Sequence, residues 1–137
     1  MMEKNTDRPR PESISFFENA IQDHDNVFSC KKLQDQVYII TRRNGDSLKV
    51  YITDLYTVGL ADYYAIKGLI PNLDAIVTLS NWNGYTYQAK IEAKKHNIGI
   101  FVMREFYGAL NNERITSYIK YDSKRKPIHF WRDSDYS

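Results

Sequence analysis

Residues 74–110, DAIVTLSNWNGYTYQAKIEAKKHNIGIFVMREFYGAL, decide the fold of this chain. Two apolar runs rich in β-branched residues predict strands, and Tyr85, Ala89 and Ala93 stand at helical spacing between them. In chain order, the predicted strand, helix, strand and short closing helix span residues 74–80, 85–97, 98–103 and 104–110. Because the second strand is apolar throughout, the pattern indicates a parallel pair of strands covered by helices.

Upstream of this unit, the pattern predicts a helix, three strands and a second helix. The first helix begins near Glu12 with an apolar stripe, and Asn44-Gly45 predicts a hairpin turn between the two strongest strands. The strands are expected at 27–33, 37–42 and 48–53, and the second helix at 59–67. An antiparallel hairpin followed by parallel crossovers predicts an α/β fold with one mixed sheet flanked by helices.

The sequence predicts one domain preceded by a short arm. Residues 1–11 are polar and charged and contain two prolines, which predicts a flexible N-terminal arm. Residues 12–137 are expected to form one α/β domain. The tail is expected to hold one edge strand at 115–121, interrupted afterwards by Lys124-Arg125-Lys126-Pro127.

Composition excludes several classes of protein. The net charge of +2 supplies no global field for nucleic acid. The single Cys30 excludes an intramolecular disulfide and a cysteine-rich zinc site, so a reducing cytoplasmic location is the simplest expectation. No stretch approaches the ~20 apolar residues of a membrane helix, so no membrane partner is expected. The sequence leaves open whether the chain forms a homo-oligomer.

The element order resembles the core of the restriction-endonuclease-like (PD-(D/E)xK) superfamily, a helix, a three-stranded meander, a helix and a further strand. The C-terminal half is similar to the Mrr-type branch, with a strand ending in Thr or Ser, an alanine-lysine step, an Ile-Gly pattern and a short helix ending in leucine. The matching segments are Val77-Thr78-Leu79-Ser80, Gln88-Ala89-Lys90, Ile98-Gly99-Ile100 and Glu105-Phe106-Tyr107-Gly108-Ala109-Leu110. The resemblance implies a restriction-endonuclease-like αβββαβαβ order and an association with nucleic acid.

The chain departs from the family at the catalytic motif. Active members need an acidic residue on the middle strand and Glu/Gln-x-Lys on the next, since carboxylates hold Mg²⁺ and the lysine supports water activation. Tyr51-Ile52-Thr53 occupies that place here. The resemblance therefore implies a lost or rearranged metal site. The nearest candidates are Asp54, Glu18 and Asp35 for catalysis, and Asp54 with Asp62 for Mg²⁺.

Two of these acids also have purely local interpretations. Asp54 and Asp62 bracket a strand-to-helix turn. They could share a divalent ion at the carboxyl end of the sheet. Alternatively, Asp54 satisfies donors in the turn and Asp62 favours the first helical turn through the helix dipole.

The loop at 80–86 is the candidate binding edge, because ligands of open α/β sheets sit at the carboxyl ends of strands. Trp82 offers a stacking face and the asparagines offer polar contacts. Lysines on the following helix could contact phosphates, or simply form a solvated face. The candidate ligand-binding residues are Ser80, Asn81, Trp82, Asn83, Gln88 and Lys90. The alternative is a helix cap with Trp82 in the core. In the binding-edge interpretation, Trp82 is partly exposed and Asn81 or Asn83 faces the same cleft.

A basic cluster, Lys124-Arg125-Lys126 near Tyr121, Phe130 and Trp131, is either a small nucleic-acid contact or a charged turn in a terminal hairpin. Three functions remain open from the sequence. The first is a degenerate nuclease or DNA-binding module of restriction-endonuclease-like fold. The second is a non-catalytic protein- or small-ligand-binding module that uses the loop 80–86. The third is a divergent Mg²⁺-dependent nuclease that combines Asp54 with Glu18 or Asp35.

Overall fold

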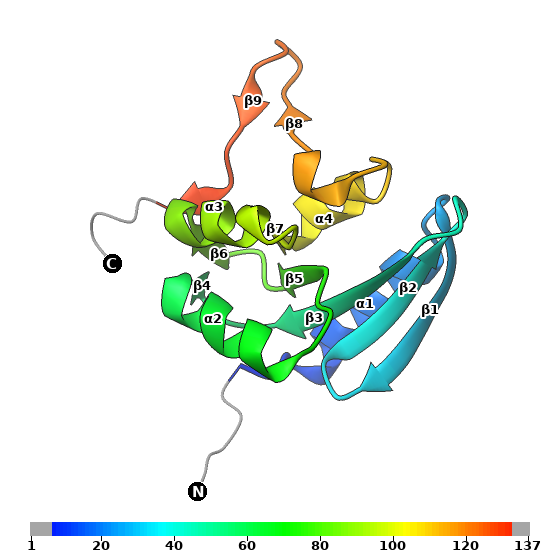
Figure 1. The fold of residues 1–137 in the computed structure, drawn as a ribbon. Helices are drawn as coiled ribbons and strands as arrows, with labels where there is room; N and C mark the ends of the chain where they lie inside the picture. The colour runs from blue at the N-terminus through cyan, green and yellow to red at the C-terminus, as the bar shows by residue number, and fades with distance from the viewer. Residues whose placement is uncertain (1–6, 133–137) are drawn as a thin grey trace, which may run out of the picture.

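Five strands form one mixed sheet in the order β1-β2-β3-β5-β7 in the computed structural model, which describes residues 7–132 (Figure 1). The first three pair antiparallel, whereas β3, β5 and β7 run parallel. The strands are β1 (Val27–Gln34), β2 (Val37–Arg42), β3 (Ser47–Thr53), β5 (Ala75–Thr78) and β7 (Gly99–Val102). The predicted mixed sheet is confirmed, and so is the predicted parallel pair, in which Ala75 lies opposite Gly99.

Helices cover both faces of this sheet, because strand side chains alternate between two apolar cores. Phe17 and Phe106 belong to the core cluster under α1 and α4, and Tyr63 and Ala89 to the cluster under α2 and α3. The helices are α1 (Pro11–Gln22), α2 (Leu60–Leu69), α3 (Tyr87–Lys95) and α4 (Met103–Ala109). The α/β class predicted from the pattern, with helices flanking a mixed sheet, is therefore observed.

A second, small sheet was not predicted. It has the order β10-β6-β4 and is parallel throughout, with β4 (Thr57–Val58), β6 (Gly84–Thr86) and β10 (Trp131–Arg132). Tyr85 lies in β6 and not in the helix, because Thr86 caps α3 by accepting a hydrogen bond from the Ala89 N–H at 3.1 Å. Gly84 permits the close strand packing, since a Cβ there would lie 2.9 Å from Nε of Arg132.

The tail after α4 also differs from the prediction. Residues 115–121 form a 3₁₀ turn, η1 (Ile115–Ser117), and then β8 (Lys120–Tyr121), which pairs antiparallel with β9 (Pro127–Ile128). The expected edge strand is thus a short projecting hairpin (Figure 1). Two-residue strands cannot be recognised by alternation, because a period of two needs a longer run.

Asp7, in the expected N-terminal arm, lies against the carboxyl end of β3. The Asp54 N–H donates to the carbonyl oxygen of Asp7 at 2.7 Å. The helix then begins at Pro11, a residue suited to the first helical position because it has no N–H to satisfy. Residues 1–6 of the arm lie outside the described residues. Within residues 7–132, no helix is long and apolar enough to cross a membrane.

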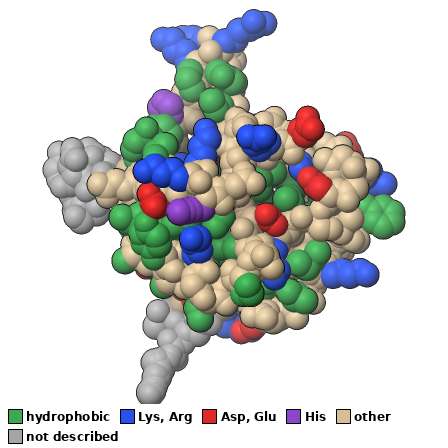
Figure 2. Space-filling view, viewed as in Figure 1, with side chains coloured by type: hydrophobic (Ala, Val, Ile, Leu, Met, Phe, Trp, Pro, Cys, Tyr) green, Lys and Arg blue, Asp and Glu red, His purple; other side chains and the backbone are tan. Residues whose placement is uncertain are grey.

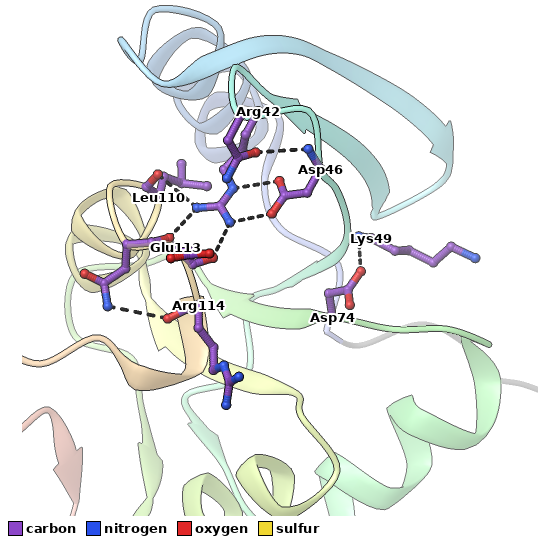
Figure 3. A network of polar contacts seen from close by, with 9 residues as sticks. Arg42, Asp46, Lys49, Asp74, Leu110, Glu113 and Arg114 are labelled. Atoms are coloured by element: carbon purple, nitrogen blue, oxygen red, sulfur yellow. Dashed lines mark hydrogen bonds and ion pairs between the residues drawn. The ribbon is translucent and has the colours of Figure 1, made fainter.

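One buried arginine ties the β2–β3 hairpin to the segment that follows α4 (Figure 3). Arg42 is 3% exposed and makes a bidentate contact with Asp46, at 2.9 and 2.6 Å. It also donates to the carbonyl oxygens of Leu110, Asn112 and Glu113. The hydrogen bonds from Arg42 lower the pKa of Asp46. A planar, charged fork of donors thus satisfies carbonyl oxygens of the segment that follows α4.

A buried ion pair joins α3 to α4 across β7. Lys90 Nζ lies 3.0 Å from Glu105 Oε2, and their side chains are 16% and 7% exposed. Glu105 also accepts from the Tyr85 hydroxyl at 2.8 Å and from the Val102 N–H at 3.3 Å, while Lys90 donates to the Ile100 carbonyl. Burial lowers the pKa of Lys90, and Glu105 opposes that shift. Each charge has several partners, so neither is left uncompensated in the interior.

We expect Glu105→Ala to lower the free energy of unfolding by about 3–5 kcal/mol, because it strands the Lys90 ammonium in a buried site. Urea unfolding at neutral pH measures the loss. Glu92→Ala is the control, since Glu92 pairs with Lys95 at the surface and its removal should change stability little. Equal, small losses for the two variants would contradict a structural role for the buried pair.

Candidate functional site

A groove of about 620 Å³ lies between the start of α1, the start of α4 and the turn after β5. Three exposed aromatic side chains line it: Phe16 is 64% exposed, Trp82 61% and Tyr107 42%. Two exposed arginines, Arg10 and Arg104, also line it. The remaining lining residues are Glu12, Ser13, Ala20, Leu79, Ser80, Asn81 and Met103. The groove thus combines a partly apolar floor with aromatic faces and positive charge.

The turn that carries Trp82 is held from inside by Asp54. Asp54 Oδ1 accepts from Ser80 Oγ at 2.5 Å and from Asn83 Nδ2 at 2.9 Å. The Asn83 amide also donates to Thr78 Oγ1 at 3.0 Å, and its backbone N–H donates to the Ser80 carbonyl. The side chains of Ser80 and Asn83 are bound inside the turn, whereas the Trp82 side chain is 61% exposed. The structure therefore presents the indole on a fixed turn.

The structure places the six predicted binding residues in four different environments, of which the buried ion pair of Lys90 is the fourth. Ser80, Asn81 and Trp82 line the groove, so Trp82 is partly exposed and shares a cleft with Asn81, as the binding-edge interpretation requires. Asn83 is 6% exposed and belongs to the support of the turn. Gln88 is exposed on α3.

Lys90 differs from both sequence interpretations, because it is neither a phosphate contact on the surface nor part of a solvated face. Its ammonium is paired with Glu105 and lies 4.4 Å from the centre of the Phe101 ring. The helical spacing alone could not reveal this, since the pairing partner comes from another helix.

The aromatic and basic groove residues that the sequence did not single out for binding, apart from Trp82, are Arg10, Phe16, Arg104 and Tyr107. Phe16 carried a usable signal, because it stands off the apolar stripe of its helix beside Phe17, and an aromatic residue off the stripe faces solvent. The arginines carried no such signal, because isolated charged residues are ordinary on helix surfaces.

The candidate catalytic and metal-binding acids each have different partners. Glu18 accepts from the Tyr38 hydroxyl at 2.5 Å, and Asp35 pairs with Arg8. Asp62 accepts from the Gly59 N–H at 2.9 Å and so caps the start of α2, which matches its local interpretation. Within residues 7–132, no group of three or more His, Cys, Asp or Glu side chains is placed to hold a metal ion.

Hydroxyl groups occupy the end of β3, where the resemblance implies a catalytic triplet. The Tyr51 hydroxyl donates to Asp7 Oδ2 at 2.6 Å, and Thr53 Oγ1 donates to the same oxygen at 3.0 Å. Gln36 donates to the Tyr51 hydroxyl oxygen and to the Ile52 carbonyl. Burial and the neighbouring Asp7 raise the pKa of Tyr51. The Tyr51 hydroxyl therefore stays protonated and keeps donating its hydrogen bond to Asp7.

No family model, curated protein or solved structure matches this chain.

We expect Asp54→Ala to loosen the Trp82 turn, because the buried Asn83 amide and the Ser80 hydroxyl lose their shared acceptor. The loss in unfolding free energy should be about 1–3 kcal/mol, the cost of leaving a buried donor unpaired. Hydrogen exchange at the Asn83 and Gly84 amides should also accelerate. Asn81→Ala, in the same turn but exposed, is the control and should change neither quantity. Unchanged exchange in Asp54→Ala would show that the turn does not depend on this carboxylate.

Proposed function

We propose that this protein is a non-catalytic nucleic-acid-binding module whose groove takes unstacked bases of a single strand. The observation that carries this proposal is the placement of Phe16, Trp82 and Tyr107 with Arg10 and Arg104 along one groove. Exposed aromatic faces stack on bases of any sequence, and guanidinium groups bind phosphate oxygens in a bidentate manner.

Local charge matters here more than total charge. The chain has a net charge of only +2, so a broad electrostatic field cannot be the source of affinity. Arg10 and Arg104 place positive charge directly beside the stacking faces, and Glu12 is the carboxylate that lines the same groove. This arrangement favours a ligand that has both rings and phosphates, which a nucleic-acid strand supplies.

The family resemblance supports the same proposal from another direction. A restriction-endonuclease-like ancestor would bring a nucleic acid to the carboxyl end of this sheet. Tyr51 and Thr53 now form the end of β3, and Asp54 holds the Trp82 turn through Ser80 and Asn83. We infer a degenerate nuclease that retains binding, with Asp54 recruited to support the binding turn.

An apolar protein segment is the rival occupant, favoured by the apolar lining residues Leu79 and Met103. Salt separates the two occupants. Phosphate contacts make the affinity for nucleic acid fall with rising salt, whereas burial of apolar groups does not weaken in this way. Binding of a mixed-sequence single strand that falls as salt rises supports the proposal, and a lack of binding at low salt contradicts it.

We expect Trp82→Ala to weaken binding of a single-stranded oligonucleotide by ~1–3 kcal/mol, since one stacking face is lost. Fluorescence anisotropy of the labelled strand measures the affinity. The thermal unfolding midpoint should change little, because the indole is 61% exposed. Phe28→Ala is the matched control, since Phe28 is a similarly exposed aromatic on β1, outside the groove lining. A large drop in the midpoint for Trp82→Ala would contradict the binding-edge interpretation.

We expect no cleavage of plasmid or oligonucleotide DNA with Mg²⁺ or Mn²⁺, because Asp54, Glu18 and Asp35 have separate partners in the structure. Gel electrophoresis after long incubation tests this directly. Clear cleavage that is lost in Asp54→Ala but kept in Asn81→Ala would instead show a rearranged metal site, and would favour the divergent nuclease.

A further inference from the structure

We propose that the hairpin formed by β8 and β9 binds the phosphates of a duplex that flanks the single strand in the groove. This inference rests on the proposed function and adds to it a substrate class, a junction between single-stranded and double-stranded nucleic acid. Three features of the hairpin carry it: the exposure of its charges, its fixed attachment to the groove, and its shape.

The basic side chains at the hairpin tip are exposed, and the neighbouring acid, Asp122, is bound to the backbone of the turn. Lys124, Arg125 and Lys126 are all exposed. Asp122 Oδ1 accepts from the backbone N–H groups of Lys124 and Lys126, at 2.8 and 2.9 Å. The Asp122 carboxylate is therefore bound to the backbone of the turn. Among the described residues, it forms no ion pair with Lys124, Arg125 or Lys126. Figure 2 shows positively charged side chains on both sides of the projecting tip.

Both ends of the hairpin are attached to α4, the helix that supplies one wall of the groove. Before β8, Tyr118 packs so closely on Gly108 that a Cβ at this position would lie 2.2 Å from the Tyr118 hydroxyl oxygen. After β9, the Phe130 ring lies 4.8 Å from the guanidinium of Arg104. Since Arg104 lines the groove, the base of the hairpin and the groove share a residue.

The chain after the hairpin reaches the other wall of the groove. In β10, Arg132 donates to the Trp82 carbonyl oxygen and stacks on Tyr56 at 4.2 Å. The hairpin is therefore held between α4 and the Trp82 turn, and its direction relative to the groove is set by the fold. A single strand of nucleic acid that leaves the groove beside Arg104 would pass the base of the hairpin.

The shape of the hairpin suits a duplex better than a single strand. It is a narrow two-stranded ribbon that projects from the body of the protein (Figure 1). Ribbons of this kind enter the grooves of a duplex, where phosphates lie on both sides. Ile119 and Tyr121, 53% and 56% exposed, stand just behind the charged tip and would contact sugars at the groove edge.

The test compares three labelled probes: a single strand, a blunt duplex, and a duplex carrying that single strand as an overhang. The hairpin variant is Lys124→Ser/Arg125→Asn/Lys126→Ser, with Asn chosen because Arg125 has a φ of 65°, which Asn tolerates. We expect the intact protein to bind the overhang probe tightest. The variant should lose on the order of tenfold in affinity for that probe at low salt, and should retain its affinity for the single strand.

Salt dependence supplies a second readout. The slope of log affinity against log salt for the overhang probe should fall by about 0.9 for each phosphate contact removed. Lys67→Ser/Lys94→Ser/Lys95→Ser removes the same charge from α2 and α3 and is the control, which should leave the preference for the overhang intact. Thermal melts check that all variants fold.

The outcomes separate this inference from the proposed function. An unchanged preference for the overhang in the hairpin variant overturns the inference, while Trp82→Ala still tests the groove. An equal loss for single strand and overhang also overturns it, because the hairpin would then be part of the single-strand site. If Trp82→Ala has no effect on any probe, the proposed groove function fails, and the inference of a junction fails with it even where the hairpin variant loses affinity for the duplex.

Discussion

The buried pair of Lys90 and Glu105 is the contact on which the carboxyl end of the sheet depends. It joins α3 to α4 directly, and through Tyr85 and the Val102 N–H it reaches β6 and the end of β7. Two charges in an interior of low dielectric are tolerated only when both are paired and hydrogen-bonded. The geometry that satisfies Glu105 therefore also sets where α4 lies.

The position of α4 in turn places residues of both the groove and the base of the hairpin. Arg104 and Tyr107 face the groove, while Gly108 provides the seat for Tyr118 at the base of the hairpin. One short helix thus presents its buried acid to the core and its exposed residues to both proposed contacts. The buried contact and the surface function are physically linked, although they lie on different sides of the same helix.

The acidic residues near the end of β3 act as hydrogen-bond acceptors within the fold. Asp54 follows β3 at the edge where a metal site would be expected, yet it accepts from Ser80 and Asn83. Asp7, from the segment before α1, receives the hydroxyl groups of Tyr51 and Thr53. A carboxylate with several donors is stabilised as an acceptor without a cation, which is the physical basis for our proposal of a binding module derived from a nuclease.

Local patterns determined the main helices and the strands of the large sheet, whereas tertiary contacts decided the small sheet and what the polar residues do. The apolar strands β5 and β7 and the Asn44-Gly45 turn were predictable, because burial on both faces and turn geometry are written within a few residues. The sequence left open whether Trp82 is exposed or in the core, and the structure shows that it is exposed. Two features could not be predicted, because each depends on partners distant in the chain. One is the burial of Lys90. The other is the groove, which brings Arg10 and Phe16 together with Arg104 and Tyr107. Only packing brings such partners together, and no local period encodes it.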